Sequence, residues 1–155
     1  MKSMEIKDTL NSIEDIIEFD RSFQGTRICT NLISQYKPLN QEYFANDEEK
    51  IRLFAYYGNQ LTGILMGNDN KYSQSQFSYF KWHLSHLFVT PPFQRNSMIR
   101  VWTHLITEFS RKIQDQTIIV QTAYNSWAFY NKQGFEYLGN FEDSIYYGKH
   151  KPLIS

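Results

Sequence analysis

Residues 87–106 read LFVTPPFQRNSMIRVWTHLI, and this stretch indicates how the rest of the chain is arranged. The apolar run that ends at Val89 is typical of a strand, and Pro91-Pro92 ends it because proline cannot donate to a sheet ladder. Further on, apolar residues recur at the 3.6-residue spacing of a helix with one buried side. These residues are Met98, Trp102, Leu105, Ile106, Phe109 and Ile113. The stretch therefore predicts a strand, a loop and a long amphipathic helix.

The segments on either side add further elements of both kinds. Apolar patterns and turn signals predict strands at 4–6, 51–57, 61–67, 77–89 and 117–122, helices at 13–23, 28–36 and 127–132, and two closing strands within 135–147. The strands at 51–57 and 61–67 flank Gly58-Asn59-Gln60 and should form a hairpin. The resulting order, βααβββαβαββ, predicts an α/β (α+β) fold: a mixed, mostly antiparallel sheet with helices on both faces.

Composition limits the classes of protein that fit. With 155 residues, of which 41% are hydrophobic, residues 1–155 should form a single domain. The 16 basic and 16 acidic residues cancel, which favours neither nucleic acid nor an anionic membrane as a partner. Cys29 is the only cysteine, so an internal disulfide and a multi-cysteine metal site are excluded, and we expect no metal. No apolar run approaches the roughly 18 residues that span a bilayer. A cytoplasmic location is the default expectation.

Two motifs in the C-terminal half resemble the GNAT superfamily of acetyltransferases. Leu87, Val89, Pro91 and Gln94 match, in register, a strand L-x-V-x-P that leads into the acetyl-CoA loop Q/R-x-x-G-x-G/A. Downstream, FYNKQGF at 129–135 resembles the family's F-Y-x-K-x-G-F. The resemblance implies a GNAT-like sheet, acetyl-CoA as acyl donor, and a primary amine of a small molecule or peptide as acceptor.

The acetyl-CoA loop departs from the family pattern at its glycines. Ser97 and Ile99 occupy the two glycine positions, and Arg95 occupies a third that is often glycine. A positive φ, which glycine adopts freely, would be costly at the β-branched Ile99. Arg95 and Arg100, however, can offer charge-assisted hydrogen bonds to phosphate.

The resemblance also implies which residues hold the donor. In the family a bulge splays the fourth strand from the fifth, and the freed backbone of Leu87, Phe88 and Val89 would pair with the pantetheine arm. A backbone N–H there would polarise the thioester carbonyl. The loop residues would hold the diphosphate at the helix N-terminus with main-chain N–H groups. These residues are Gln94, Arg95, Asn96, Ser97, Met98 and Ile99.

Side-chain roles follow in the same way, each with an alternative. Tyr130 would protonate the departing thiolate, or it is an ordinary packing aromatic. His83 and His86 are the candidates for the base that deprotonates the amine, with His86 slightly preferred as nearer the thioester; a structural histidine or a water relay is the alternative. An unbulged strand would place the two histidines on opposite faces. Asn125 would bond coenzyme A, or cap the short helix that follows.

Three functions remain open on the sequence. The first is a working N-acetyltransferase, and the second is a catalytically impaired GNAT-fold module that binds acyl-CoA or regulates a partner. The third is a structural α/β domain. The acceptor is not identified, since its expected aromatic neighbours also suit a core: Phe23, Tyr36, Tyr43, Phe44 and Tyr146. Family members are often dimers, so a homodimer is possible.

Overall fold

The computed structural model describes residues 3–24, 41–69, 81–95, 99–142 and 145–150. Seven strands form one sheet in the order β1-β2-β3-β4-β5-β7-β6. They are β1 Met4–Lys7, β2 Lys50–Tyr57, β3 Gln60–Asp69, β4 Trp82–Val89, β5 Ile118–Ala123, β6 Phe135–Glu142 and β7 Ile145–His150. β4 and β5 run parallel, and the other neighbouring pairs are antiparallel. The predicted mixed, mostly antiparallel sheet is confirmed.

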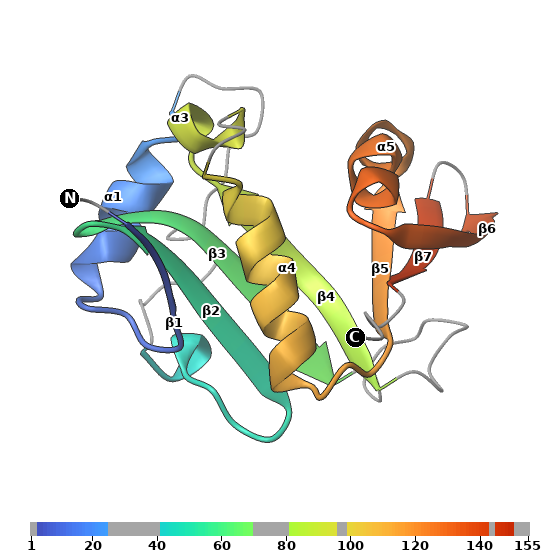
Figure 1. Cartoon of the computed structure of the whole chain (residues 1–155), viewed down its shortest axis with the longest axis horizontal. Helices are drawn as coiled ribbons and strands as arrows, with labels where there is room; N and C mark the ends of the chain where they lie inside the picture. The colour runs from blue at the N-terminus through green and yellow to red at the C-terminus, as the bar shows by residue number, and fades with distance from the viewer. Residues whose placement is uncertain (1–2, 25–40, 70–80, 96–98, 143–144, 151–155) are drawn as a thin grey trace.

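Helices cover both faces of this sheet (Figure 1). They are α1 Glu14–Arg21, α3 Pro91–Gln94, α4 Val101–Lys112 and α5 Tyr124–Lys132, together with the 3-10 helix η1 Gln41–Phe44. α4 lies on one face and α1 on the other. The second predicted helix, at 28–36, and Cys29 fall outside the described residues.

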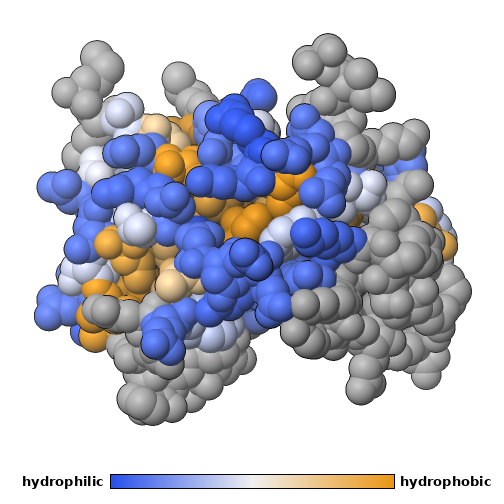
Figure 2. Space-filling view, turned by 90° about the horizontal axis from the view of Figure 1, so that it is seen from below, coloured by the Kyte–Doolittle hydropathy of each residue, from blue (hydrophilic) through white to orange (hydrophobic). Residues whose placement is uncertain are grey.

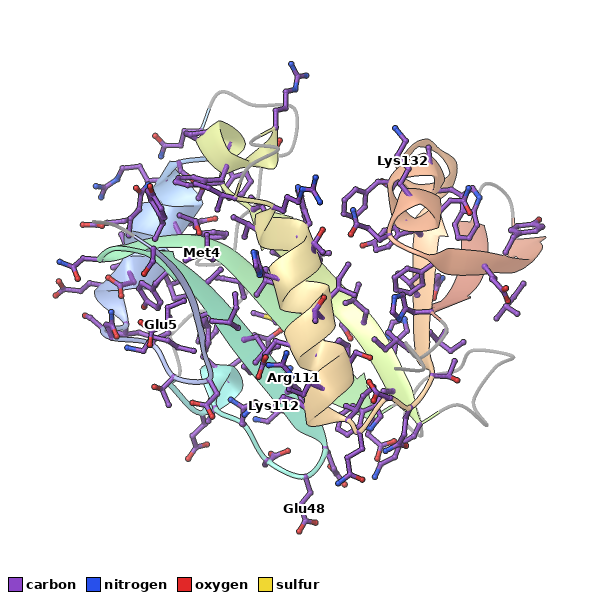
Figure 3. All side chains as sticks on the ribbon, viewed as in Figure 1. Met4, Glu5, Glu48, Arg111, Lys112 and Lys132 are labelled. Atoms are coloured by element: carbon purple, nitrogen blue, oxygen red, sulfur yellow. The ribbon has the colours of Figure 1, made fainter. Side chains whose placement is uncertain are left out.

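The α4 face is closely packed because β3 presents glycines to the helix. A Cβ on Gly63 would lie 2.7 Å from Cγ1 of Val101, and one on Gly67 would lie 2.4 Å from Cζ of Phe109. Real Cβ atoms essentially never approach so closely, so α4 sits nearer the sheet than any side chain at these positions would allow. At the far end of α4, Arg111 and Lys112 occupy the last turn, where positive charge complements the helix dipole (Figure 3).

The α1 face has its own aromatic core. Phe19 and Phe23 of the α1 region are each 1% exposed and pack with Phe54 and Ile64 of the sheet. Phe88 of β4 is partly buried and packs against this cluster, with its ring centroid 6.5 Å from that of Phe23. The outer surface seen from below carries mostly hydrophilic side chains, with apolar groups in small separate areas (Figure 2).

Several element boundaries differ from those predicted. α4 begins at Val101 instead of near Met98, because Arg100 has a positive φ of 51° that a helix cannot contain. β4 begins at Trp82, after a bend at Lys81, and the first predicted residues of this strand, 77–80, lie outside the described residues. α5 begins at Tyr124, three residues earlier than expected. The short helix α3 was not predicted; its two prolines occupy the first turn, where a missing N–H costs nothing.

Candidate active site

β4 and β5 separate part-way along their length. They pair from Trp82 to Leu84 of β4, and beyond Leu84 no described residue of β4 pairs with β5. The strands diverge toward the end at which β4 leads to α3 (Figure 1). Leu87–Val89 remains paired with β3 on its other side. Within the described ranges, the β5-facing edge of this segment has no strand partner, so its backbone can pair with an extended ligand.

A bulge lies just beyond the last paired position. Met66 of β3 pairs with His86 and Gly67 pairs with Leu84, so Ser85 is an extra residue in β4. An extra residue reverses the alternation of side chains between faces. His83 and His86 therefore lie on the same face, opposite α4, and the expectation of opposite faces is wrong because it assumed an unbulged strand.

Beyond the bulge the strand is regular, so the side chains of the next three residues alternate between the two faces. Leu87 and Val89 are buried in the cluster beneath α4. Phe88 lies on the histidine face, with its ring centroid 5.7 Å from that of His86. The predicted donor strand thus presents its backbone at the sheet edge while its side chains are held on the two faces.

The N-terminal end of α4 faces the same opening in the sheet. Gln94 is held by its own side chain, since Nε2 donates to the carbonyl of Val89 at 2.8 Å. Its main-chain oxygen accepts a 3.4 Å bond from Nε1 of Trp102. Arg95 is exposed, and Arg100 has a left-handed backbone, with a φ of 51°.

Tyr130 lies on α5, across the opening from α4. Burial raises the pKa of its phenol to about 12, so the hydroxyl stays protonated through the physiological range. Its ring packs edge-on against Phe135 at 5.4 Å and Phe129 at 5.1 Å. Phe129 in turn meets Trp102 of α4 at 4.8 Å, so aromatic rings connect the two helices.

The histidines of β4 are suited to remain neutral. Burial lowers the pKa of both His83 and His86. The positive charge of Arg52 lowers the pKa of His86 further, and His86 does the same for His83. Nδ1 of His86 is buried without a hydrogen-bond partner in the described part of the chain. A neutral imidazole in this position can accept a proton from a substrate.

Several predicted residues of the acetyl-CoA loop and of α5 lie partly or wholly outside the described part of the chain. Asn96, Ser97 and Met98 fall outside the described residues, and so does the side chain of Asn125. The backbone of Asn125 belongs to the first turn of α5, one residue after the helix begins at Tyr124. It is therefore not the residue that precedes the helix, as the capping alternative required.

Sequence reasoning missed a polar group next to the histidines. Arg52 of β2 is 2% exposed, and Asn68 of β3 and Ser85 of β4 link it to His83 by hydrogen bonds. The signal was an arginine inside the apolar run IRLFAYY, which a buried strand holds only when the charge has polar partners.

A cavity of about 530 Å³ lies elsewhere, between the segment at 8–13 that enters α1 and residues 44–46. Phe44 lines it, but none of the residues predicted to bind the donor or to transfer protons does. The candidate site is therefore the opening between β4 and β5, not this cavity.

Comparison with known proteins agrees with this geometry. A family model described as an acetyltransferase (GNAT) domain matches residues 24–143. The chain belongs to the GNAT acetyltransferase family. A search of curated proteins finds no match. The match extends across β4, α4 and β5.

Solved GNAT structures share the fold at low identity. The PaiA N-acetyltransferase of Thermoplasma acidophilum, in complex with coenzyme A, is 17% identical with a TM-score of 0.64, over 96% of this chain and 99% of that one. An acetyltransferase of Thermus thermophilus is 14% identical with a TM-score of 0.66, over 97% of each chain. An aminoglycoside 6'-N-acetyltransferase complexed with coenzyme A is 13% identical with a TM-score of 0.66, over 96% of each.

The described residues include neither a membrane-spanning helix nor a cluster of metal ligands. Among them, no helix is both long and apolar enough to span a membrane. Within the same residues, no group of three or more His, Cys, Asp or Glu side chains could hold a metal ion.

Proposed function

We propose that this GNAT protein moves an acetyl group from acetyl-CoA to a primary amine of a small molecule or peptide, by direct attack in a ternary complex. The observation that carries the proposal is the separation of β4 from β5 beyond Leu84, which leaves a strand edge without a partner beside Tyr130's helix and the α4 N-terminus. A purely structural domain would have no need to leave this edge open.

The donor is held mainly by backbone. Leu87, Phe88 and Val89 pair with the pantetheine arm as a neighbouring strand would, and one of their N–H groups polarises the thioester carbonyl. The segment from Gln94 to Ile99 holds the diphosphate at the start of α4, where N–H groups lack intrahelical partners. Arg95, exposed at the end of α3, supplies positive charge. Asn125, at the start of α5, adds a polar contact to coenzyme A.

The transfer needs one base and one acid. His86, or His83, takes a proton from the substrate ammonium, and the free amine attacks the carbonyl carbon. The nitrogen of the tetrahedral intermediate loses its second proton to water. The intermediate then collapses, the C–S bond breaks, and Tyr130 gives its proton to the thiolate and regains one from water. The raised pKa of Tyr130 makes it a weaker acid than a free phenol. A thiolate that leaves beside Tyr130 would lose water contacts as well, which would raise the pKa of its thiol in the same direction and favour the transfer.

Tyr130→Phe tests this assignment. Turnover should fall by roughly 10²- to 10⁴-fold, because the thiolate loses its proton donor. Protection by acetyl-CoA against thermal unfolding should persist, because the ring and its packing remain. Phe129→Leu is the matched control, since it alters a neighbouring ring and removes no proton. Turnover in Tyr130→Phe equal to that of the wild type would contradict the role.

The alternative function is an acyl-CoA-binding or regulatory module without catalysis. Replacement of the loop glycines, together with the left-handed Arg100, favours it. Acetyl-CoA at a hundred times its dissociation constant should stabilise either protein by about 2.7 kcal/mol. Release of free thiol in the presence of a panel of amines separates the two functions. No protection at millimolar acetyl-CoA would exclude both.

A further inference from the structure

A line of hydrogen bonds crosses three strands on the histidine face. Cα register places Arg52 opposite Met66 and Met66 opposite His86, while Asn68 lies opposite His83 in the next row. These side chains therefore share one face of the sheet, beside the point where β4 and β5 part.

The line starts at a group that can only donate. Arg52 is 2% exposed, and its Nη1 contacts Oδ1 of Asn68 at 3.2 Å and the carbonyl of Gly67 at 3.0 Å. Because a guanidinium has no acceptor, the amide of Asn68 must turn its oxygen toward Arg52. Its nitrogen then points the other way, toward Oγ of Ser85 at 2.5 Å.

The hydrogen bond between Ser85 and His83 runs in the same donor-to-acceptor direction. Its oxygen accepts from Asn68, so its single proton needs an acceptor of its own. Nδ1 of His83 lies 3.3 Å from that oxygen. If His83 donated instead, the serine proton would have no acceptor among the described residues. The arrangement that pairs every donor has Ser85 donating to Nδ1, which places the proton of a neutral imidazole on Nε2.

We infer that Arg52, Asn68 and Ser85 fix His83 as a hydrogen-bond donor through Nε2, so that His83 recognises an oxygen of the acceptor and leaves His86 to take the proton from its amine. This inference rests on the proposed acetyltransferase function and deepens it. His83 becomes a specificity-determining residue, and Arg52, Asn68 and Ser85 are positioning residues.

The inference narrows the class of acceptor. With its Nδ1 lone pair engaged by Ser85 and its Nε2 protonated, His83 has no free lone pair for a substrate proton. It offers one N–H on the face opposite α4. The acceptor should therefore carry an oxygen near its amine, such as the hydroxyl of an amino alcohol or the carbonyl of an amino acid amide. A simple alkylamine leaves that N–H unpaired.

The tautomer can be read in the free protein, without substrate. Long-range ¹H–¹⁵N spectra of histidine-labelled protein at about pH 8, above the ordinary histidine pKa, distinguish the protonated ring nitrogen from the bare one. The His83→Gln variant assigns the signals of His83 among the four histidines. We expect the His83 proton on Nε2. A proton on Nδ1 overturns the inference.

Asn68→Asp should reverse the donor-to-acceptor direction of these hydrogen bonds, while the side chain at position 68 keeps nearly the same shape. A carboxylate cannot donate, so Ser85 should donate to Asp instead and accept from Nδ1 of His83, which moves the His83 proton to Nδ1. Ser85→Ala is the matched control: it breaks the line without reversing it, and both tautomers should appear. A His83 tautomer unchanged in both variants would show that something else fixes it.

Acceptor pairs then test the consequence for specificity. Ethanolamine should be preferred over propylamine in the wild type, and Asn68→Asp should reduce that ratio of kcat/KM by roughly 10- to 100-fold. An equal ratio in both proteins overturns the specificity role. If the proposed acetyltransferase function itself is wrong, no amine reacts in any variant, while the tautomer result stands on its own.

Discussion

The two faces of β4 contribute different things to the molecule. The side facing α4 is apolar and at most 9% exposed, and consists of Trp82, Leu84, Leu87 and Val89. The opposite side is only half-buried and carries the polar groups His83, Ser85 and His86 together with Phe88. One strand of eight residues thus serves both the core and the candidate site.

The difference between the faces depends on one extra residue. A regular strand would alternate through all eight positions, which would put His83 and His86 on opposite sides. The bulge at Ser85 lets the apolar residues before and after it share the α4 face, and gathers both histidines on the other. The same extra residue therefore completes the apolar face beneath α4 and gathers the polar side chains of the candidate site on the other face.

Deleting Ser85 should have the largest effect, because it abolishes the distinction between the faces. Without the bulge, either Trp82 and Leu84 or Leu87 and Val89 must turn away from α4. Each displaced apolar side chain costs about 1.5–3 kcal/mol, against a total stability of roughly 5–15 kcal/mol. We expect loss of the cooperative urea transition followed by circular dichroism.

Ser85→Ala is the control for the deletion, since it keeps the chain length. It removes only the hydrogen bonds of the hydroxyl and should cost about 1–2 kcal/mol. A deletion variant as stable as Ser85→Ala would show that the bulge does not determine which residues face α4.

Protonation of His86, on the polar face of β4, should have an effect of intermediate size, seen in the pH dependence of turnover. His86 acts while neutral, and burial together with the charge of Arg52 lowers its pKa below 6.5. With both substrates saturating, kcat should stay level down to pH 6.5 and then fall about tenfold per pH unit below the His86 pKa. His86→Gln should remove this fall along with most activity, whereas exposed His104→Gln should keep it. A fall centred above pH 6.5 would contradict the assignment.

The free energy of unfolding should also decrease as the pH falls. The folded-state pKa of both histidines is lower than that of the unfolded chain, so the folded protein resists their protonation. Their contribution is therefore fully present above about pH 6.5 and is lost as the pH falls through the folded-state values.

Sequence patterns predicted the elements whose signals are local. The periodicity of the long helix identified α4, and Gly58 identified the hairpin turn, where its φ is 64°. The bulge at Ser85 was not predictable, because register depends on the partner strand β3 and not on β4 alone. α3 was missed because two prolines suggested only the end of a strand.

The candidate site was predictable mainly through resemblance. The motif identified the strand edge and Tyr130, but the hydrogen-bond line from Arg52 joins residues that lie 16 and 17 positions apart, beyond any local pattern. Aromatic residues considered for an acceptor pocket belong in part to the core instead: Phe23 and Phe44 are 1% and 4% exposed. Composition cannot separate these uses, because a core and a pocket need the same residues.

Arg100→Gly should have the smallest effect. It tests whether the left-handed backbone directly before α4, the helix on the apolar face, costs stability. Arg100 has φ 51° and ψ 55° directly before Val101, which is fully buried against the sheet. A left-handed conformation costs a non-glycine residue about 1–2 kcal/mol, and glycine's greater freedom in the unfolded chain offsets about 0.5–1 kcal/mol of the relief. We therefore expect a gain of roughly 0.5 kcal/mol by urea unfolding. Arg100→Ala is the control, because it removes the side chain, which has an interaction of its own, and keeps the strain. A glycine variant less stable than the alanine variant would mean that the left-handed turn at Arg100 stores no strain.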